Sequence, residues 1–301
     1  MKTGRLLATL VCWPLVLFAG DHHPPSPAFA LTPLTDSITL LQGRGGNIVA
    51  SHGPDGVLLV DADFADMSAA LRTAVHSLDS GPVRYLLNTH WHGDHTGGNT
   101  ALGAAASIIA HHNVRARLMV PQHRPSRGGV TEPLARSGWP VVTFEQGLAV
   151  HFNGEEIQVR HLPHGHTDGD AVVTFTGSKV VHLGDLFFAG RFPFIDLDTG
   201  GSVAGYLENV GALLDELPGD VTIVPGHGPV STRDDLREYH GMLLATRSWV
   251  REQRAAGLTL EQAVVKGLPG QWDGWGTGFI DEATWIGTLY RDSAVEGGGE
   301  R

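Results

Sequence analysis

One short segment concentrates side chains that bind divalent metal ions. Residues 89–98 read Thr-His-Trp-His-Gly-Asp-His-Thr-Gly-Gly, so three imidazoles and one carboxylate fall within six residues. In extended backbone, side chains two residues apart point to the same side, so His90 and His92 can reach one metal ion. The glycine that follows permits a tight turn, which brings Asp94 and His95 toward a second position. Imidazole and carboxylate are both zinc ligands, so the segment predicts a metal site.

The segments around this motif alternate between strand and helix patterns. Short apolar runs bounded by turn residues predict strands, and apolar residues spaced by three or four predict helices. We expect strands over residues 37–42, 47–51, 57–60, 83–87, 107–110, 141–144, 156–160, 171–175, 179–182 and 221–224. We expect helices over residues 66–78, 202–217 and 234–254, and a surface loop over residues 121–140. This alternation predicts an α/β fold with helices outside buried sheet.

The composition limits the classes of partner. The chain has 301 residues, with 17 His, one Cys, 21 Lys+Arg and 32 Asp+Glu, and its net charge is -11. Nucleic acids and anionic membrane surfaces attract proteins rich in Lys and Arg. We therefore expect a small-molecule substrate and no nucleic-acid partner. A chain with many histidines and one cysteine builds metal sites from imidazole and carboxylate rather than from thiolates.

The N-terminal segment has the features of a secretory signal peptide, in the usual order. A basic start precedes an apolar stretch over residues 6–20, and the small-residue motif Ala-Phe-Ala ends at Ala30. An apolar run of about 15 residues is short for a transmembrane helix. We predict a signal peptide over residues 1–30, a mature domain over residues 31–295, and a periplasmic or secreted location with no stable membrane anchor after cleavage.

Four motifs occur in an order that points to a known family. The sequence His-x-His-x-Asp-His at 90–95 resembles the signature of the metallo-β-lactamase-fold hydrolases. The turns Gly-His-Thr-Asp-Gly at 165–169, Leu-Gly-Asp at 183–185 and Pro-Gly-His-Gly at 225–228 resemble the family's later ligand turns. The resemblance runs over residues 38–227 and implies a four-layer αββα sandwich.

The resemblance also implies two metal ions, with zinc expected and iron or manganese accepted by the same donors. The implied ligands are His90, His92 and His166 for the first ion, Asp94, His95 and His227 for the second, and Asp185 bridging both. A metal-bridging hydroxide would attack an activated carbonyl, and Asp94 would also orient that hydroxide. Asp61 is either an aspartate that orients a ligand histidine or a turn residue. His161 and His164 could compete with His166 for its place.

The substrate class stays open at this point. One β-lactamase subclass has a cysteine where this chain has Asp185, and the complete ligand set is more similar to glyoxalase II, lactonases and related hydrolases. Esters, thioesters, lactones and β-lactams are all candidate substrates. The phenylalanine-rich segment 187–194, which contains Arg191, either lines a pocket for an apolar, anionic substrate or is core beneath a loop. Trp91 and the segment 272–275 could border the same cleft.

Two rival functions share the fold. A non-haem iron enzyme of the persulfide dioxygenase type would use one iron and molecular oxygen. A non-catalytic metal-binding protein would keep the ligands without turnover, although such a protein has no need of an open, bridged pair of metal positions.

Overall fold

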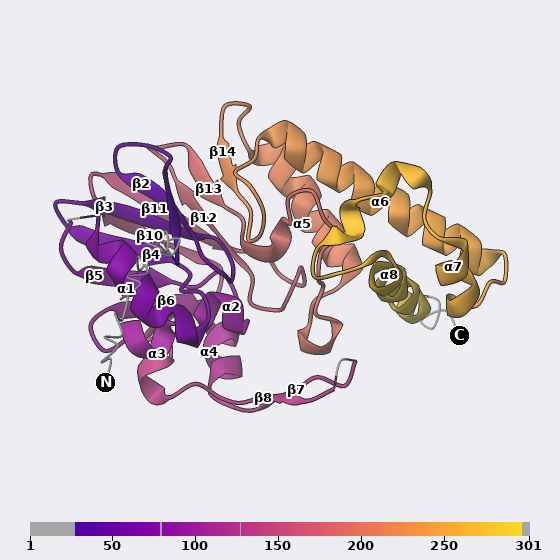
Figure 1. Cartoon of the computed structure of the whole chain (residues 1–301), viewed down its shortest axis with the longest axis horizontal. Helices are drawn as coiled ribbons and strands as arrows, with labels where there is room; N and C mark the ends of the chain where they lie inside the picture. The colour runs from indigo at the N-terminus through magenta and orange to yellow at the C-terminus, as the bar shows by residue number, and fades with distance from the viewer. Residues whose placement is uncertain (1–27, 79, 127, 297–301) are drawn as a thin grey trace, which may run out of the picture.

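A computed structural model describes residues 28–78, 80–126 and 128–296 of the chain. Two β-sheets pack face to face, and helices cover the outer face of each (Figure 1). This arrangement is the four-layer αββα sandwich that the motifs implied. Residues 1–27 of the predicted signal peptide lie outside the described residues.

The first sheet has seven strands in the order β1-β2-β3-β4-β5-β6-β9. Their bounds are β1 (Ala30–Pro33), β2 (Ile38–Gln42), β3 (Ile48–Gly53), β4 (Gly56–Val60), β5 (Val83–Leu87), β6 (Ser107–His111) and β9 (Val142–Phe144). The strands from β1 to β4 pair antiparallel, and those from β4 to β9 pair parallel.

The second sheet has five strands in the order β10-β11-β12-β13-β14. Their bounds are β10 (Gly147–Phe152), β11 (Glu155–His161), β12 (Ala171–Phe175), β13 (Val180–His182) and β14 (Thr222–Val224). All neighbours pair antiparallel except β13 and β14, which pair parallel.

Apolar side chains on the two faces of the first sheet belong to two different hydrophobic clusters. In β4, Leu58 faces the second sheet and joins a buried cluster with Val173 and Phe175. Its neighbour Leu59 faces the other way and joins a cluster with Leu71 of α1. Because successive side chains of a strand point to opposite faces, a strand buried on both faces must be apolar throughout.

The helices divide between the two outer layers. Their bounds are α1 (Ser68–His76), α2 (Gly93–Thr96), α3 (Asn99–Leu102), α4 (His112–Leu118), α5 (Val203–Glu216), α6 (Arg233–Ala255), α7 (Leu260–Lys266) and α8 (Glu282–Glu296). Helices α1, α3 and α4 lie with the first sheet, and α5 and α6 pack on the second. In Figure 1, α6, α7 and α8 extend from the sheets as a helical end of the molecule. No described helix is both long and apolar enough to cross a membrane.

Every strand and helix predicted from the sequence overlaps an observed one, but the expected loop over residues 121–140 is not purely a loop. It contains a hairpin of β7 (Gln122–His123) and β8 (Val130–Thr131), which runs along the bottom of Figure 1 toward the helical end. The strands β1, β7, β8 and β10 and the helices α2, α3, α4, α7 and α8 were not predicted. In β10 apolar residues alternate at Leu148, Val150 and Phe152, but only Phe152 is fully buried and the run is short.

The pairing directions bring the candidate ligands to one edge of the sandwich. The 90–95 motif follows β5, and Asp61 follows the parallel strand β4. His166 lies between β11 and β12, while Asp185 and His227 follow the parallel strands β13 and β14. Since β12 runs antiparallel to β13, the start of β12 and the end of β13 meet at the same edge.

The predicted cleavage bond after Ala30 falls inside the described fold. Ala30 opens β1 and pairs with Gln42 of β2. Phe29 is 3% exposed and belongs to the apolar cluster that contains Leu41 and Ile48. Cleavage at this bond would therefore remove a buried aromatic side chain.

Candidate metal centre

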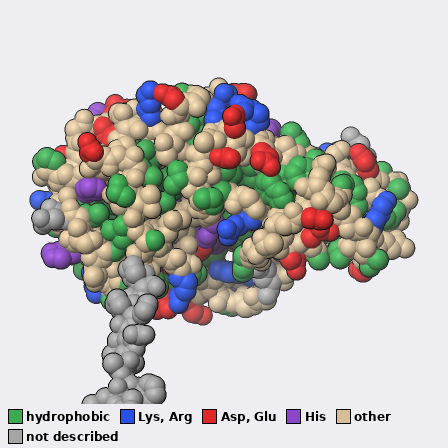
Figure 2. Space-filling view, turned by 45° about the horizontal axis from the view of Figure 1, so that its top comes forward, with side chains coloured by type: hydrophobic (Ala, Val, Ile, Leu, Met, Phe, Trp, Pro, Cys, Tyr) green, Lys and Arg blue, Asp and Glu red, His purple; other side chains and the backbone are tan. Residues whose placement is uncertain are grey.

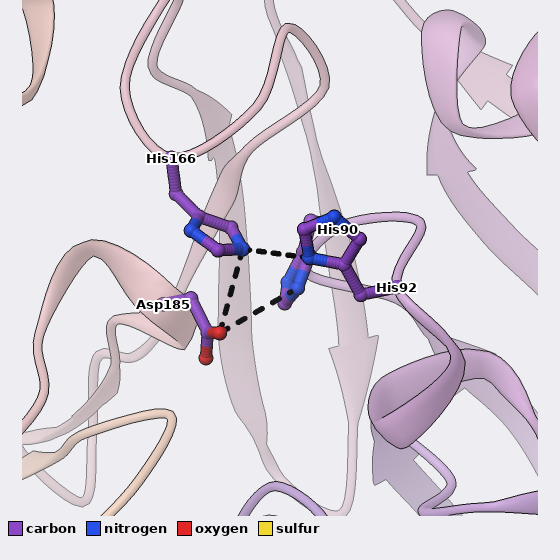
Figure 3. A group of neighbouring side chains, drawn as sticks. All are labelled: His90, His92, His166 and Asp185. Atoms are coloured by element: carbon purple, nitrogen blue, oxygen red, sulfur yellow. Dashed lines mark hydrogen bonds and ion pairs between the residues drawn. The ribbon is translucent and has the colours of Figure 1, made fainter. Parts of the chain in front are cut away.

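The loops at this edge assemble the seven implied ligands into two groups. His90, His92, His166 and Asp185 form the first group, with one donor atom of each within 4.8 Å of the others (Figure 3). Asp94, His95 and His227 form the second. The loop positions thus bring together residues that are far apart in the sequence.

The carboxylate of Asp185 faces both groups. Its Oδ2 lies 3.8 Å from Nε2 of His90 and 3.4 Å from Nε2 of His166. Its Oδ1 lies 3.2 Å from Nε2 of His95 and 3.5 Å from Nε2 of His227. One oxygen therefore faces each group of histidines, which is the placement that a bridging carboxylate requires.

The buried polar atoms of this cluster fit a pair of cations. Nε2 of His90, Nε2 of His95 and Oδ1 of Asp185 are buried and have no hydrogen-bond partner among the described residues. An unpaired buried polar atom is costly in a folded protein and needs a partner. Imidazole nitrogens and a carboxylate oxygen converging on one space are suitable ligands for divalent zinc.

Asp61 fixes the orientation of His95 and, through Thr89, that of His90. Its buried carboxylate accepts hydrogen bonds from the Thr89 backbone N–H at 2.8 Å, from the Thr89 hydroxyl at 2.7 Å and from His95 Nδ1 at 2.7 Å. The Thr89 hydroxyl also lies 3.0 Å from Nδ1 of His90. Asp61 adopts the left-handed region, with φ of 67°, which is uncommon for a non-glycine residue and costs strain. These bonds leave Nε2 of each histidine to face the cluster.

Asp196 performs the same task for His92 and was not predicted. Nε2 of His92 donates to the Asp196 carboxylate at 2.8 Å, and Nδ1 of His166 donates to the Phe194 carbonyl at 2.7 Å. The remaining ring nitrogens, Nδ1 of His92 and Nε2 of His166, are 2.8 Å apart. Asp196 belongs to no motif, and only the folded chain brings it to His92 across 104 positions of sequence.

Charges around the cluster set the protonation of its members. Burial lowers the pKa of His92 to about 4, although the hydrogen bond to Asp196 opposes this shift. Burial raises the pKa of Asp185, but the charges of His95 and His227 outweigh burial and hold this pKa well below its usual range. Burial also lowers the pKa of His227, yet the Asp185 carboxylate raises it to about 9. A cation in the second group would take the place of the proton on that ring.

The remaining histidines near the motifs lie outside the cluster. His161 stacks on His111 with ring centroids 3.7 Å apart, and His164 is exposed. His182 bonds to backbone through both ring nitrogens, accepting from the Gly184 N–H and donating to the Asn47 carbonyl. His166, and not its two neighbours, therefore occupies the expected place.

A cavity of about 490 Å³ opens over the cluster. It is lined by the site residues His92, Asp94, Asp185 and His227, by the cations Arg44, Arg124 and Arg191, and by the apolar side chains Phe64, Phe188, Phe192, Phe194, Phe279 and Ile280, together with Gly93. In Figure 2, basic and histidine side chains border a hollow between the sheets and the helical end of the molecule. The cavity combines positive charge with apolar walls.

Some of the aromatic residues considered in the sequence analysis line the cavity, and others pack in the core. Within the segment 187–194, most of the aromatic side chains and Arg191 line the cavity, while Phe187 packs on Tyr239 in the core. Trp91 is 2% exposed and packs beneath the cleft. The tryptophans of segment 272–275 pack against the core of the second sheet, so the wall from this part of the chain is instead Phe279 and Ile280.

Known proteins share both the sequence pattern and the fold. Residues 41–228 match the family model of the metallo-beta-lactamase superfamily. A hydroxyacylglutathione hydrolase of Aeromonas salmonicida is 30% identical over 131 residues, covering 44% of this chain and 44% of that protein. The chain spans about half the length of the curated hydroxyacylglutathione hydrolases it matches.

Solved structures show the same fold. The stereoselective inverting sec-alkylsulfatase Pisa1 from Pseudomonas sp. has a TM-score of 0.65 at 15% identity, over 87% of this chain and 50% of that chain. A metallo-beta-lactamase from Pontibacter korlensis has a TM-score of 0.58 at 18% identity, over 72% of this chain and 99% of that chain. The family match covers more than half of the sequence, and the chain belongs to the metallo-beta-lactamase superfamily.

Proposed function

We propose that the protein is an exported, dinuclear zinc hydrolase that attacks an activated carbonyl. The observation that carries this proposal is the Asp185 carboxylate, which lies between two groups of histidines with one oxygen toward each. A donor set of this kind, with buried atoms that lack partners, supports two cations rather than one. The proposal that the protein is exported rests on the signal-peptide pattern of its N-terminal sequence.

Each group of side chains would hold one ion. His90, His92 and His166 would hold the first, Asp94, His95 and His227 the second, and Asp185 would contact both. When bound, two such ions lower the pKa of a shared water and polarise the carbonyl of the substrate.

Asp94 is the ligand best placed to act on the attacking water. Its side chain is 24% exposed and lines the cavity, whereas the other carboxylate of the cluster, Asp185, is 4% exposed. Oδ2 of Asp94 lies 3.2 Å from Nε2 of His227. We assign Asp94 the orientation of the attacking water.

The substrate is a small molecule with an activated carbonyl. Similarity to hydroxyacylglutathione hydrolases supports thioesters, and the solved metallo-beta-lactamase fold keeps β-lactams in the set with esters and lactones. The net charge of -11 does not favour nucleic acid or an anionic membrane as a partner.

A panel assay tests the proposal. The mature protein, loaded with zinc, is assayed on a chromogenic β-lactam, an acyl thioester, a lactone and an aryl ester, each with and without a chelator. We expect chelator-sensitive hydrolysis of at least one substrate and two zinc ions per chain by elemental analysis. One bound iron with oxygen uptake would instead identify the dioxygenase, and metal without turnover would identify a binding protein.

A further inference from the structure

We propose that Arg124 and Arg191 form an anion-binding subsite at the mouth of the cleft, selecting an apolar substrate with a carboxylate remote from the scissile carbonyl. This inference rests on the proposed hydrolase function, because the subsite serves the same cavity. It names the class of substrate that the family assignment leaves open.

The three cations of the cavity are not equivalent. Arg44 forms an ion pair with Asp66 and lies 4.9 Å over the ring of Phe64. Its charge is therefore already matched within the protein. Arg124 and Arg191 form no ion pair with any of the residues that the structure describes. Their charge remains available to a ligand.

Arg124 is the more constrained of the two. It belongs to the β7–β8 hairpin, and its guanidinium carbon lies 5.5 Å over the ring of Trp91. Its Nε is buried and lacks a hydrogen-bond partner within the described part of the chain. A buried guanidinium nitrogen without an acceptor is costly, and an anionic ligand oxygen would supply that acceptor.

The hairpin that carries Arg124 is attached to the turn behind the metal centre. The Ser126 backbone N–H and hydroxyl both donate to Oδ2 of Asp198, at 3.0 and 2.5 Å. The Asp198 N–H in turn donates to Asp196 at 3.2 Å, and Asp196 holds His92. The position of Arg124 is therefore set relative to the metal ligands.

Arg191 comes from the opposite part of the chain, after Asp185. Its aliphatic stem lies against Gly278, where a Cβ would come within 3.1 Å of Arg191 Cδ. Its backbone N–H bonds to the Phe188 carbonyl at 3.4 Å. The stem is thus packed against the backbone at Gly278, and Arg191 lines the cavity.

The apolar walls account for the rest of the substrate. Phe279 is 73% exposed and contacts Phe194 edge to face, with ring centroids 6.3 Å apart. Together with Phe194 and Ile280, this ring lines the cavity and offers an apolar surface to a ligand. Phe279 and Ile280 lie beyond the family match at 41–228, so the family motifs do not define this wall of the cavity.

Matched substrates test the subsite. Mono-p-nitrophenyl esters of straight-chain dicarboxylic acids present a remote carboxylate, and p-nitrophenyl alkanoates of the same chain length present none. We expect the zinc-loaded protein to prefer the acidic esters by about tenfold in kcat/KM, through a lower KM. Arg124→Gln and Arg191→Gln should each remove most of this preference, because kcat/KM should fall much further on the acidic esters than on the neutral esters. Arg160→Gln, in an exposed ion pair with Glu216, is the control.

A binding measurement keeps the subsite testable if turnover is absent. Quenching of tryptophan fluorescence is followed on addition of octanoate or of neutral octanol, because Arg124 lies over Trp91. We expect tighter binding of octanoate, lost in Arg124→Gln. No hydrolysis of any substrate, in the panel or in either ester series, would reject the proposed function, while preferential octanoate binding would still support the subsite.

Three results would overturn the inference. The first is equal kcat/KM on acidic and neutral esters together with equal binding of octanoate and octanol. The second is an Arg124→Gln or Arg191→Gln variant that slows both ester series alike. The third is release of sulfate from octyl sulfate without cleavage of the acidic esters, because the anion would then be the reacting group itself.

Discussion

At the scale of single residues, buried carboxylates decide which nitrogen of His92 and of His95 faces the metal space. Asp196 takes the proton-bearing Nε2 of His92, and Asp61 takes Nδ1 of His95. Each ring is thereby held with its other nitrogen toward the cluster. Such outer partners raise ligand basicity and fix the ring orientation.

Replacing the carboxylate behind His92 should weaken metal binding. Asp196→Asn keeps the shape but removes the charge that holds His92 Nε2–H, so we expect zinc affinity to fall by about 10- to 100-fold. Competition with a chromophoric chelator measures the zinc affinity. The matched control is Asp36→Asn, which makes the same change at an exposed aspartate. Unchanged affinity in Asp196→Asn would show that the contact has no part in orienting the ring.

Removing a ligand should abolish turnover without unfolding the protein. His92→Ala takes away a ring of the first group, and Asp94→Ala takes away the carboxylate proposed to orient the attacking water. We expect the hydrolysis rate to fall to the chelator-treated level in both variants, with unchanged far-ultraviolet circular dichroism. Full activity in both variants would contradict the dinuclear mechanism.

The residues that could be predicted from the sequence are those gathered in local motifs. His90, His92 and Asp94 lie in one turn, where spacing alone suggests a shared ion. Asp196 and Arg124 carry no such pattern, because their partners come from strands and turns far along the chain. Tertiary contacts of this kind have no signal in a single sequence.

At the scale of elements, two strand ends meet in a stack of histidines. His111 ends β6, His161 ends β11, and their rings are stacked at 3.7 Å with an interplanar angle of 13°. Burial, reinforced by the charges of His161 and His112, lowers the pKa of His111 to about 4. The neutral ring is therefore the form that the folded state prefers.

This stack should make stability sensitive to mild acid. A histidine whose folded pKa is lowered contributes stability above its unfolded pKa of about 6.5, and that contribution is lost as the pH falls toward 4. Between pH 6.5 and 4, we expect the free energy of unfolding of His111→Gln to fall by about 1 to 2 kcal/mol less than that of the parent protein. Urea unfolding at a series of pH values measures the difference, and parallel curves would contradict the account.

The burial of Phe29 predicts that cleavage after Ala30 lowers the stability of the fold. Phe29 is buried beside β2, so a chain that starts at residue 31 should be less stable than one that starts at residue 28 by about 2 kcal/mol. Denaturant unfolding of the two chains gives this difference. Equal stabilities would show that Phe29 adds nothing and that the predicted cleavage costs the fold nothing.

Elements with a strong apolar pattern were predictable, and the short hairpin of β7 and β8 was not. Each residue of β4 is buried, and its run of aliphatic residues stands out. The hairpin strands β7 and β8 have only two residues each, and the composition of their segment resembles a loop. Their place over the cleft follows from the Ser126 contacts with Asp198, which only the folded chain shows.

At the scale of the whole molecule, the sandwich places a positively lined cleft on a negatively charged protein. The chain carries a net charge of -11, yet three arginines line the cavity over the metal cluster. The helical end contributes Phe279 and Ile280 to the same cavity. The sheets hold the proposed ligands, and the hairpin and helical end shape the access to them.

A zinc titration of chelator-treated protein tests the central claim most directly. Hydrolysis of the best substrate from the panel is recorded as zinc is added, and bound zinc is measured in the same samples. Because Asp185 lies between two complete groups of donors, we expect activity to rise from zero and to saturate at two zinc ions per chain. Saturation at one ion, or no hydrolysis at any zinc content, would contradict a dinuclear hydrolase.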